Sequence, residues 1–137
     1  MRTVLDADAL LALVASTHRA HREMRARLEA GRRLGAAVVV PTVMLAELYR
    51  GRGRSGALDA FLARERRALV LRDTDRALAH LVGGVLHAAG AGSEDIVDAH
   101  AVAVTAEDDR AVVVTGDPGD LERLAAPYPG VTVVALS

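Results

Sequence analysis

The sequence contains no cysteine, no lysine and no tryptophan. Without cysteine there can be no disulfide and no thiolate metal site. Without lysine, a Walker-type phosphate-binding lysine and a Schiff-base lysine are both excluded, and arginine supplies every basic side chain. The aromatic residues are Tyr49, Phe61 and Tyr128. They are few for a protein that would bind single strands by stacking bases on aromatic rings.

Long apolar runs are also missing. No stretch approaches the roughly 18 apolar residues of a membrane-spanning helix, and residues 1–6 lack the apolar segment of a secretory signal. We therefore expect a cytoplasmic protein. Of the 137 residues, 51% are hydrophobic and 26% are charged, which is the composition of a folded globular chain. This length predicts one domain, spanning residues 1–137.

The charges are unevenly distributed along the chain, although the net charge is only −1. Residues 1–76 hold 15 of the 17 basic residues and 9 of the 18 acidic ones, whereas residues 77–137 are strongly acidic. Such a division suits a basic surface beside an acidic pocket. Charges scattered over solvated helices would give the same count.

Short β-branched runs alternate with longer helical stretches. The pattern predicts strands at 3–5, 37–40, 68–71, 111–114 and 131–136. It predicts helices at 7–14, 18–33, 42–49, 57–64, 74–89, 94–106 and 121–125, with a glycine-rich loop at 51–56. Alternating strands and helices imply right-handed crossovers. The predicted fold is therefore α/β, with a mostly parallel sheet of about five strands flanked by helices.

Two acidic residues follow predicted strands. Asp6 comes directly after the first strand, and Asp117 comes three residues after Val114. Ligands of open parallel sheets bind beyond the carboxyl ends of the strands. These positions therefore suit a ligand site, although an aspartate after a strand can equally cap the next helix.

Two further acids lie within apolar helices. Glu47 is the only charge in the stretch 42–49, and its neighbours one turn earlier are apolar. A carboxylate there either reaches a solvated edge or points into a site, since burying it unpaired would be too costly. Asp98 lies one turn inside a very apolar helix, on the same face as Asp95. Helix capping explains Asp95 but not Asp98.

Four stretches carry a resemblance to a known family. The chain resembles the PIN domain, and within it the toxin nucleases of VapBC-type toxin–antitoxin pairs. The matching stretches are residues 4–10, 45–51, 95–99 and 113–117, which contain Leu5-Asp6, Ala46-Glu47-Leu48, Val97-Asp98-Ala99 and Thr115-Gly116-Asp117. Each motif is weak alone. Their expected order over nearly the whole chain makes the resemblance specific.

The resemblance implies an acidic cluster that is both catalytic and metal-binding, made of Asp6, Glu47, Asp98 and Asp117. Four neighbouring polar residues could join or support it: Asp8, Asp95, Thr115 and Asp120. Asp120 is an alternative or a partner to Asp117, because family members vary in the acid that completes the site. Asp8 stands where the family often has a small or polar residue, and could add a ligand.

Carboxylate oxygens are the hard ligands that Mg²⁺ and Mn²⁺ prefer. Such ions can activate a water, neutralise a phosphate and stabilise a leaving oxygen. The resemblance thus implies a Mg²⁺-dependent endoribonuclease, with Mn²⁺ as a substitute, that leaves 5′-phosphate and 3′-hydroxyl ends. It also implies a toxin that forms a homodimer and is neutralised by a VapB-like antitoxin.

Basic residues beside Glu47 could bind the RNA. Arg50, Arg52 and Arg54 alternate with glycines, and arginine binds phosphate through a planar fork. The alternative is a solvated loop whose arginines only aid solubility. We expect His18 and His21 to be solvated as well.

Three other interpretations fit less well. Asp6-Ala7-Asp8 and the acidic stretch 116–120 resemble motifs of haloacid-dehalogenase-like phosphatases. That class needs a lysine to hold the phosphate, and it gives Glu47 no role. A response-regulator receiver domain fails on the same missing lysine. A PIN-fold module that binds RNA or a partner without cleaving it remains the non-enzymatic alternative.

Overall fold

A computed structural model describes residues 2–50 and 52–137 of the chain, without the side chains of residues 52 and 53. The strands are β1 (Arg2–Leu5), β2 (Val38–Pro41), β3 (Leu69–Arg72), β4 (Ala111–Thr115) and β5 (Val131–Ala135). The helices are α1 (Ala7–Val14), α2 (His21–Leu34), α3 (Val43–Leu48), α4 (Arg52–Arg64), α5 (Arg76–Ala89), the 3₁₀ turn η1 (Ser93–Asp95), α6 (Ile96–Ala106) and α7 (Pro118–Ala125).

The five strands form one sheet in the order β3-β2-β1-β4-β5, and every pairing is parallel. The central strand β1 pairs with β2 through Val4 and Val39, and with β4 through Val4 and Val113. Since all strands run the same way, their carboxyl ends meet at one edge. The predicted α/β fold with a parallel sheet of about five strands is therefore confirmed.

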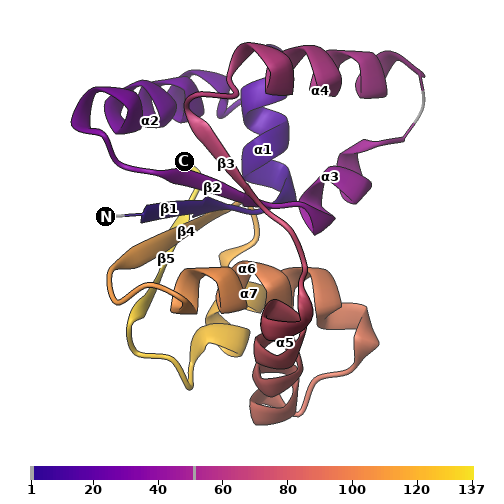
Figure 1. The fold of residues 1–137 in the computed structure, drawn as a ribbon, viewed down its shortest axis with the longest axis vertical. Coiled ribbons are helices and arrows are strands. Elements are labelled where there is room, and N and C mark those ends of the chain that lie inside the picture. The colour runs from indigo at the N-terminus through magenta and orange to yellow at the C-terminus, as the bar shows by residue number, and fades with distance from the viewer. Residues whose placement is uncertain (1, 51) are drawn as a thin grey trace.

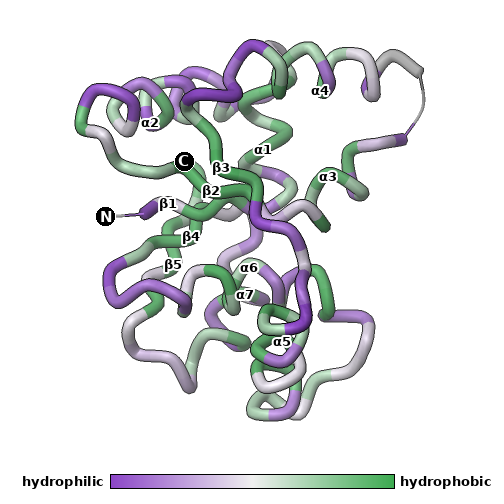
Figure 2. The backbone as a smooth tube through the Cα atoms, in the orientation of Figure 1, coloured by the Kyte–Doolittle hydropathy of each residue, from purple (hydrophilic) through white to green (hydrophobic). Residues whose placement is uncertain are grey.

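Helices cover both faces of the sheet (Figure 1). Helices α1, α2 and α4 lie on one side, and α5, α6 and α7 lie on the other. Both Val4 and Leu5 are fully buried, although consecutive strand residues point to opposite faces. Figure 2 accordingly shows hydrophobic strands in the centre and hydrophilic segments on the outer helices. Helices α2 and α5 end at Gly35 and Gly90, which adopt the left-handed conformation that favours glycine.

The predicted loop at 51–56 is wrong for the residues that the structure describes. Helix α4 already begins at Arg52, so the glycines at 53 and 56 lie in its first turns, while Gly51 lies outside the described residues. Each helical glycine costs about 1 kcal/mol relative to alanine. Leu58 and Phe61, both buried further along α4, stabilise the helix through packing. That packing is invisible to local propensity.

No helix in the described ranges has the length and apolar character needed to cross a membrane.

Candidate active site

The carboxyl edge of the sheet carries the predicted acids. Asp6 follows the last residue of β1, and its backbone N–H donates to the carbonyl of Val114 on β4, at 3.2 Å. Its side chain caps α1, with Oδ1 accepting a hydrogen bond from the N–H of Ala9 at 2.9 Å. Both predicted roles of Asp6, a helix cap and a residue at the ligand-binding edge, are thus compatible in one position.

Asp6 is buried, with only 7% of its surface exposed. Burial raises the pKa of its carboxyl, and the charge of Asp8 adds to this effect. Hydrogen bonds from Thr115 and from the N–H of Ala9 oppose it without cancelling it. Thr115 is fully buried, and its Oγ1 accepts from the N–H of Asp117 at 2.9 Å. Thr115 therefore links Asp6 to the loop that follows β4.

Asp98 lies in the first turn of α6, a helix that packs against β1 and β4. Burial raises the pKa of its carboxyl to about 6. The charges of neighbouring aspartates contribute, in decreasing order Asp120, Asp6, Asp95 and Asp117. A carboxyl that is partly desolvated and surrounded by like charges favours a cation or a proton beside it.

A pocket of about 280 Å³ opens between these elements. It is lined by Asp6, Ala7, Asp8, Met44, Glu47, Glu94, Val97 and Asp98. The structure therefore brings together three residues of the predicted quartet: Asp6 directly after β1, Glu47 on α3 and Asp98 on α6. Glu47 lies at the rim, where its side chain is 39% exposed and 3.4 Å from the guanidinium of Arg50.

The fourth predicted acid does not line this pocket. Asp117 and Asp120 both stand at the start of α7, and both are exposed. Their charges nevertheless raise the pKa of Asp98, and Asp120 does so more strongly than Asp117. Asp120 therefore affects the Asp98 carboxyl more strongly than Asp117, which the resemblance placed in the quartet.

Two of the accessory residues have partners of their own. Asp95 accepts a hydrogen bond from Arg123 of α7 at 3.1 Å. Asp8 Oδ1 lies 3.1 Å from Nε2 of His18, whose Nδ1 accepts from the N–H of Ala20 at 3.0 Å. This acceptor role at Nδ1 leaves the proton on Nε2, so His18 donates to Asp8. The expectation that His18 is solvated is wrong, because its side chain is only 14% exposed.

The predicted helix at 94–106 begins at Glu94, but the sequence did not indicate that this side chain lines the pocket. Its spacing of four residues from Asp98 could have indicated a shared helical face. Of the predicted RNA-binding arginines, Arg50 is exposed and pairs with Glu47. Arg54 is exposed on α4, while the side chain of Arg52 lies outside the described residues.

The pocket fits a hard divalent cation in its donor chemistry, because every ionisable group that lines it is a carboxylate. Within the described part of the chain, no three His, Cys, Asp or Glu side chains converge closely enough to form a ready-made metal site. Mg²⁺ keeps several waters and binds proteins through one or two carboxylates. Asp6, which is buried, and Asp98, whose carboxyl is partly desolvated, are the residues that would hold it.

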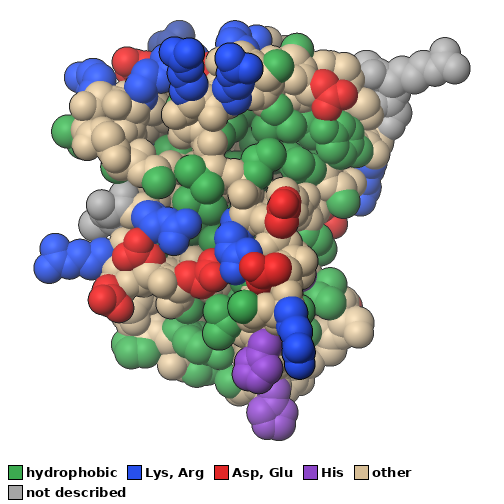
Figure 3. All heavy atoms as spheres, viewed as in Figure 1, with side chains coloured by type: hydrophobic (Ala, Val, Ile, Leu, Met, Phe, Trp, Pro, Cys, Tyr) green, Lys and Arg blue, Asp and Glu red, His purple; other side chains and the backbone are tan. Residues whose placement is uncertain are grey.

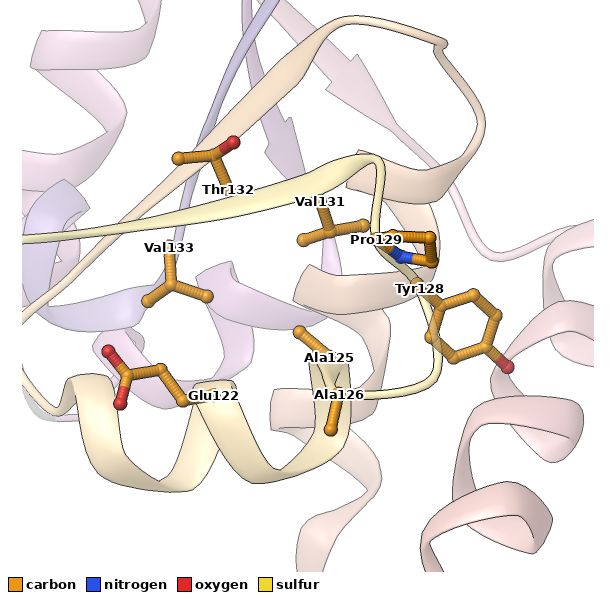
Figure 4. A pocket seen from close by; sticks show the side chains of 8 residues that line it. All are labelled: Glu122, Ala125, Ala126, Tyr128, Pro129, Val131, Thr132 and Val133. Atoms are coloured by element: carbon orange, nitrogen blue, oxygen red, sulfur yellow. The ribbon is translucent and has the colours of Figure 1, made fainter.

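A larger hollow, of about 400 Å³, lies between α7 and β5 (Figure 4). Val131 and Val133 point toward α7 there, while Thr132 points away. Its lining is mostly apolar, and Glu122 is its only carboxylate. The acidic pocket, not this hollow, therefore concentrates the groups that can do chemistry.

The fold and the pocket define a class: a parallel α/β domain with an acidic pocket at the carboxyl edge of its sheet. The PIN domain family matches residues 3–127, and the chain belongs to this family.

Solved structures with a similar fold include two VapBC complexes. One is VapBC2 from Rickettsia felis bound to a DNA fragment from its promoter, at 19% identity and a TM-score of 0.68, covering 100% of both chains. The other is DNA-bound VapBC from Salmonella typhimurium, at 18% identity and a TM-score of 0.66, covering 100% of this chain and 99% of that one. Among curated proteins, no sequence matches.

Proposed function

We propose that the protein is a Mg²⁺-dependent endoribonuclease, with Mn²⁺ as a substitute, and that it acts as the toxin of a toxin–antitoxin pair. The observation that carries the proposal is the convergence of Asp6, Glu47 and Asp98 on one pocket in a PIN domain. These residues come from three separate elements, so local sequence does not account for their meeting. Acting on cellular RNA, the protein would work in the cytoplasm.

Each acid has a distinct part in this chemistry. A bound divalent ion would supply charge neutralisation at the scissile phosphate and a more acidic water. Asp6 and Asp98 would bind it, since burial and the charges of neighbouring aspartates raise the pKa of both carboxyls, so that both gain from a cation. Glu47, at the rim of the pocket, would orient a water or accept its proton. Asp117 and Asp120 would complete the negative field from the α7 side.

The proposed partners rest on different observations. The two similar structures are VapBC complexes, which supports a VapB-like antitoxin that covers the acidic pocket. A homodimer is supported by exposed apolar side chains on the edge strand β3 and on the following helix α5, where Leu71 is 44% and Leu81 is 42% exposed. Exposed apolar edge strands tend to be covered by another chain.

The proposal is tested by RNA cleavage with protein free of host nucleases. Cleavage should require Mg²⁺ or Mn²⁺, stop with EDTA, and be lost in Asp6→Asn and Asp98→Asn. Each 1.4 kcal/mol of lost transition-state stabilisation is about tenfold in rate. Glu122→Gln, which removes an acid from the α7–β5 hollow, is the matched control and should cleave like the wild type. Full activity in both pocket variants would overturn the assignment.

An inert RNA-binding or partner-binding module is the second candidate. It is favoured by the lack of a ready three-ligand metal group in the described part of the chain. Titration with Mn²⁺ separates the two, because an inert module should show no saturable binding that depends on Asp6 and Asp98.

A further inference from the structure

A buried carboxylate organises arginines on the side of the molecule that α2 and α4 form. Glu65, directly after α4, is only 3% exposed. Its Oε1 accepts a hydrogen bond from Arg25 at 3.0 Å, and its Oε2 accepts one from Arg32 at 2.6 Å. Arg64 lies 3.7 Å from the same carboxylate. Arginines from two helices are thus held in fixed positions by one glutamate.

These arginines carry more charge than Glu65 can neutralise. Burial raises the pKa of the Glu65 carboxyl, but the hydrogen bond from Arg25 and the charges of Arg25, Arg32 and Arg64 outweigh it, so the net pKa is lowered. Three cations therefore face two carboxylates, Glu65 and the exposed Glu29, which lies 3.8 Å from Arg32. Arg66 and Arg67 follow immediately and are exposed, and the side chains described by the structure offer them no ion-pair partner. Figure 3 shows the resulting basic side chains along the top of the molecule, over α2 and the end of α4.

A groove of about 250 Å³ lies between Arg32 and Arg67. Arg32 lies on its α2 side and Arg67 on its β3 side. The rest of the lining is mostly small: Gly31, Gly35, Ala36, Ala37 and Ala68, with Val70. Small residues let a strand approach the backbone, and a guanidinium fork binds phosphate oxygens in a bidentate manner. The two guanidinium groups give the groove the charge to bind a phosphate of a nucleic-acid backbone.

This basic surface, defined by Arg25, Arg32, Arg64, Arg66 and Arg67, is separate from the acidic pocket. Arg67 and Glu65 precede β3, at the amino end of the sheet, whereas Asp6 follows the carboxyl end of β1. Strands of four residues separate the two edges by about 13 Å at 3.3 Å per residue. Arg50, which pairs with Glu47 at the rim of the pocket, and Arg54, near the start of α4, do not belong to the basic surface.

We propose that the basic surface binds the sugar-phosphate backbone of RNA at a distance from the acidic pocket. The identity of the nucleic acid rests on the proposed ribonuclease function; the phosphate chemistry rests on the arginines alone. Since this chain has few aromatic residues, contacts to phosphate dominate the affinity. RNA strands long enough to reach both edges of the sheet bind more tightly than strands confined to the pocket.

The test measures binding of a fluorescein-labelled single-stranded RNA by anisotropy across a salt series. All proteins carry Asp98→Asn, which prevents cleavage. The test variant is Arg66→Gln/Arg67→Gln, which leaves the contacts of Glu65 intact. The matched control is Arg76→Gln/Arg110→Gln, which removes two exposed arginines from α5 and from the start of β4. Melting temperatures of both variants should match the parent, because exposed substitutions usually change stability by less than about 0.5 kcal/mol.

The test variant should bind RNA more weakly, with a salt dependence flatter by up to about 0.7 log units for each lost contact. The control should retain the slope of the parent. Equal salt slopes in all three proteins would overturn the proposal. It would also be overturned if the test variant lost affinity for polyglutamate, a polyanion without phosphate, but kept its affinity for RNA. Wild-type protein that never cleaves RNA, with a flatter slope in the test variant, would refute the ribonuclease function and leave the basic surface standing.

Discussion

His18 donates a hydrogen bond from Nε2 to Oδ1 of Asp8 across 3.1 Å, at the edge of the acidic pocket. On its other side, the Asp8 carboxylate lies so close to the backbone of Gly116 that a Cβ there would overlap Oδ2. The first turn of α1, the turn before α2 and the loop after β4 therefore meet at one carboxylate. Asp8 also lines the acidic pocket with Asp6, whose pKa its charge raises.

The first prediction concerns Gly116→Ala. The new methyl group should force Asp8 to rotate and break its bond to His18, at a cost of about 1 kcal/mol for the lost hydrogen bond. Asp8→Ala removes the obstacle, so the double variant should be scarcely less stable than Asp8→Ala alone. Urea denaturation of the four proteins gives the coupling energy. Additive effects would show that the close approach of Asp8 and Gly116 does not constrain this loop.

The second prediction concerns pH and Asp98. Its carboxyl has a pKa of about 6 in the folded chain, against an ordinary value of 3.8. Between these values the folded chain holds more protons than the unfolded chain, so its stability falls as pH rises through this window. The ionised Asp98 carboxylate lowers the free energy of unfolding by at most about 3 kcal/mol. The loss is smaller than this limit because the side chain keeps contact with solvent.

Asp98→Asn should therefore be more stable than the wild type at about pH 7 without metal, and this advantage should vanish near pH 4. Calorimetric scans in EDTA at the two pH values measure the difference. Glu107→Gln, in the turn after the same helix, is a control that should not gain stability at neutral pH, since Glu107 pairs with Arg72 at 2.8 Å. An Asp98→Asn protein that melts below the wild type at both pH values would contradict a crowded acidic pocket.

The third prediction concerns divalent ions. A ligand that binds only the folded chain stabilises it by about 2.7 kcal/mol at a hundredfold excess over its dissociation constant. Mg²⁺ should thus raise the melting temperature of the wild type by roughly 5–10 °C, at about 2–4 °C per kcal/mol for a chain of this size. The increase should be smaller in Asp6→Asn and in Asp98→Asn. An equal increase in all three proteins would place the bound ion elsewhere.

Local sequence signals predicted most elements but not the contacts between distant ones. The helix at 7–14 was placed correctly, because an aspartate precedes an apolar stretch there and its side chain caps the helix. The predicted helix at 57–64 begins later than α4, because the glycines before it indicate a loop. Packing of Leu58 and Phe61 stabilises the longer helix that the structure shows. Propensity is a weak signal, and tertiary packing overrides it.

The same distinction holds for the site. Asp6 could be predicted from its place after a strand, because strand ends determine the ligand edge of a parallel sheet. His18 could not, because its bond to Asp8 depends on the turn between α1 and α2. Glu65 stands in an arginine-rich stretch and looks like a solvated charge; its burial depends on arginines of α2, 33 and 40 residues away.

The fourth prediction concerns the dimer. Leu71→Glu places a charge on an exposed apolar position of edge strand β3, and should convert the proposed homodimer to a monomer. Leu34→Glu is the matched control, because Leu34 is 81% exposed and belongs to α2, not to the edge strand. Light scattering at micromolar concentration measures both masses. A wild-type protein that is already monomeric would refute the dimer and leave the nuclease proposal untouched.

The last prediction concerns Glu65 and acid stability. Its arginine partners hold the folded-state pKa of the carboxyl below its usual value. The unfolded chain therefore binds more protons than the folded chain at acid pH. The stability that this cluster contributes is fully present above the pKa that Glu65 has in the unfolded chain, and it is lost as the pH falls through the pKa of Glu65 in the folded chain. Glu65→Gln removes both the charge and this dependence. Because the arginines stay partly exposed, at 41% for Arg25 and 51% for Arg32, the loss near neutral pH should be about 1–3 kcal/mol and not that of a buried orphan charge.

Urea denaturation from about pH 7 down to pH 3 measures the difference in free energy of unfolding between the wild type and Glu65→Gln. This difference should shrink as the wild-type carboxylate becomes protonated. Glu29→Gln is the matched control. Glu29 lies 3.8 Å from Arg32 but is 54% exposed, so its removal should change stability by less than about 0.5 kcal/mol. A Glu65→Gln protein as stable as the wild type at neutral pH would mean that the arginines of α2 and α4 are not held by Glu65. In that case the basic surface would have no preformed arrangement, and its binding of RNA would depend on charge density alone.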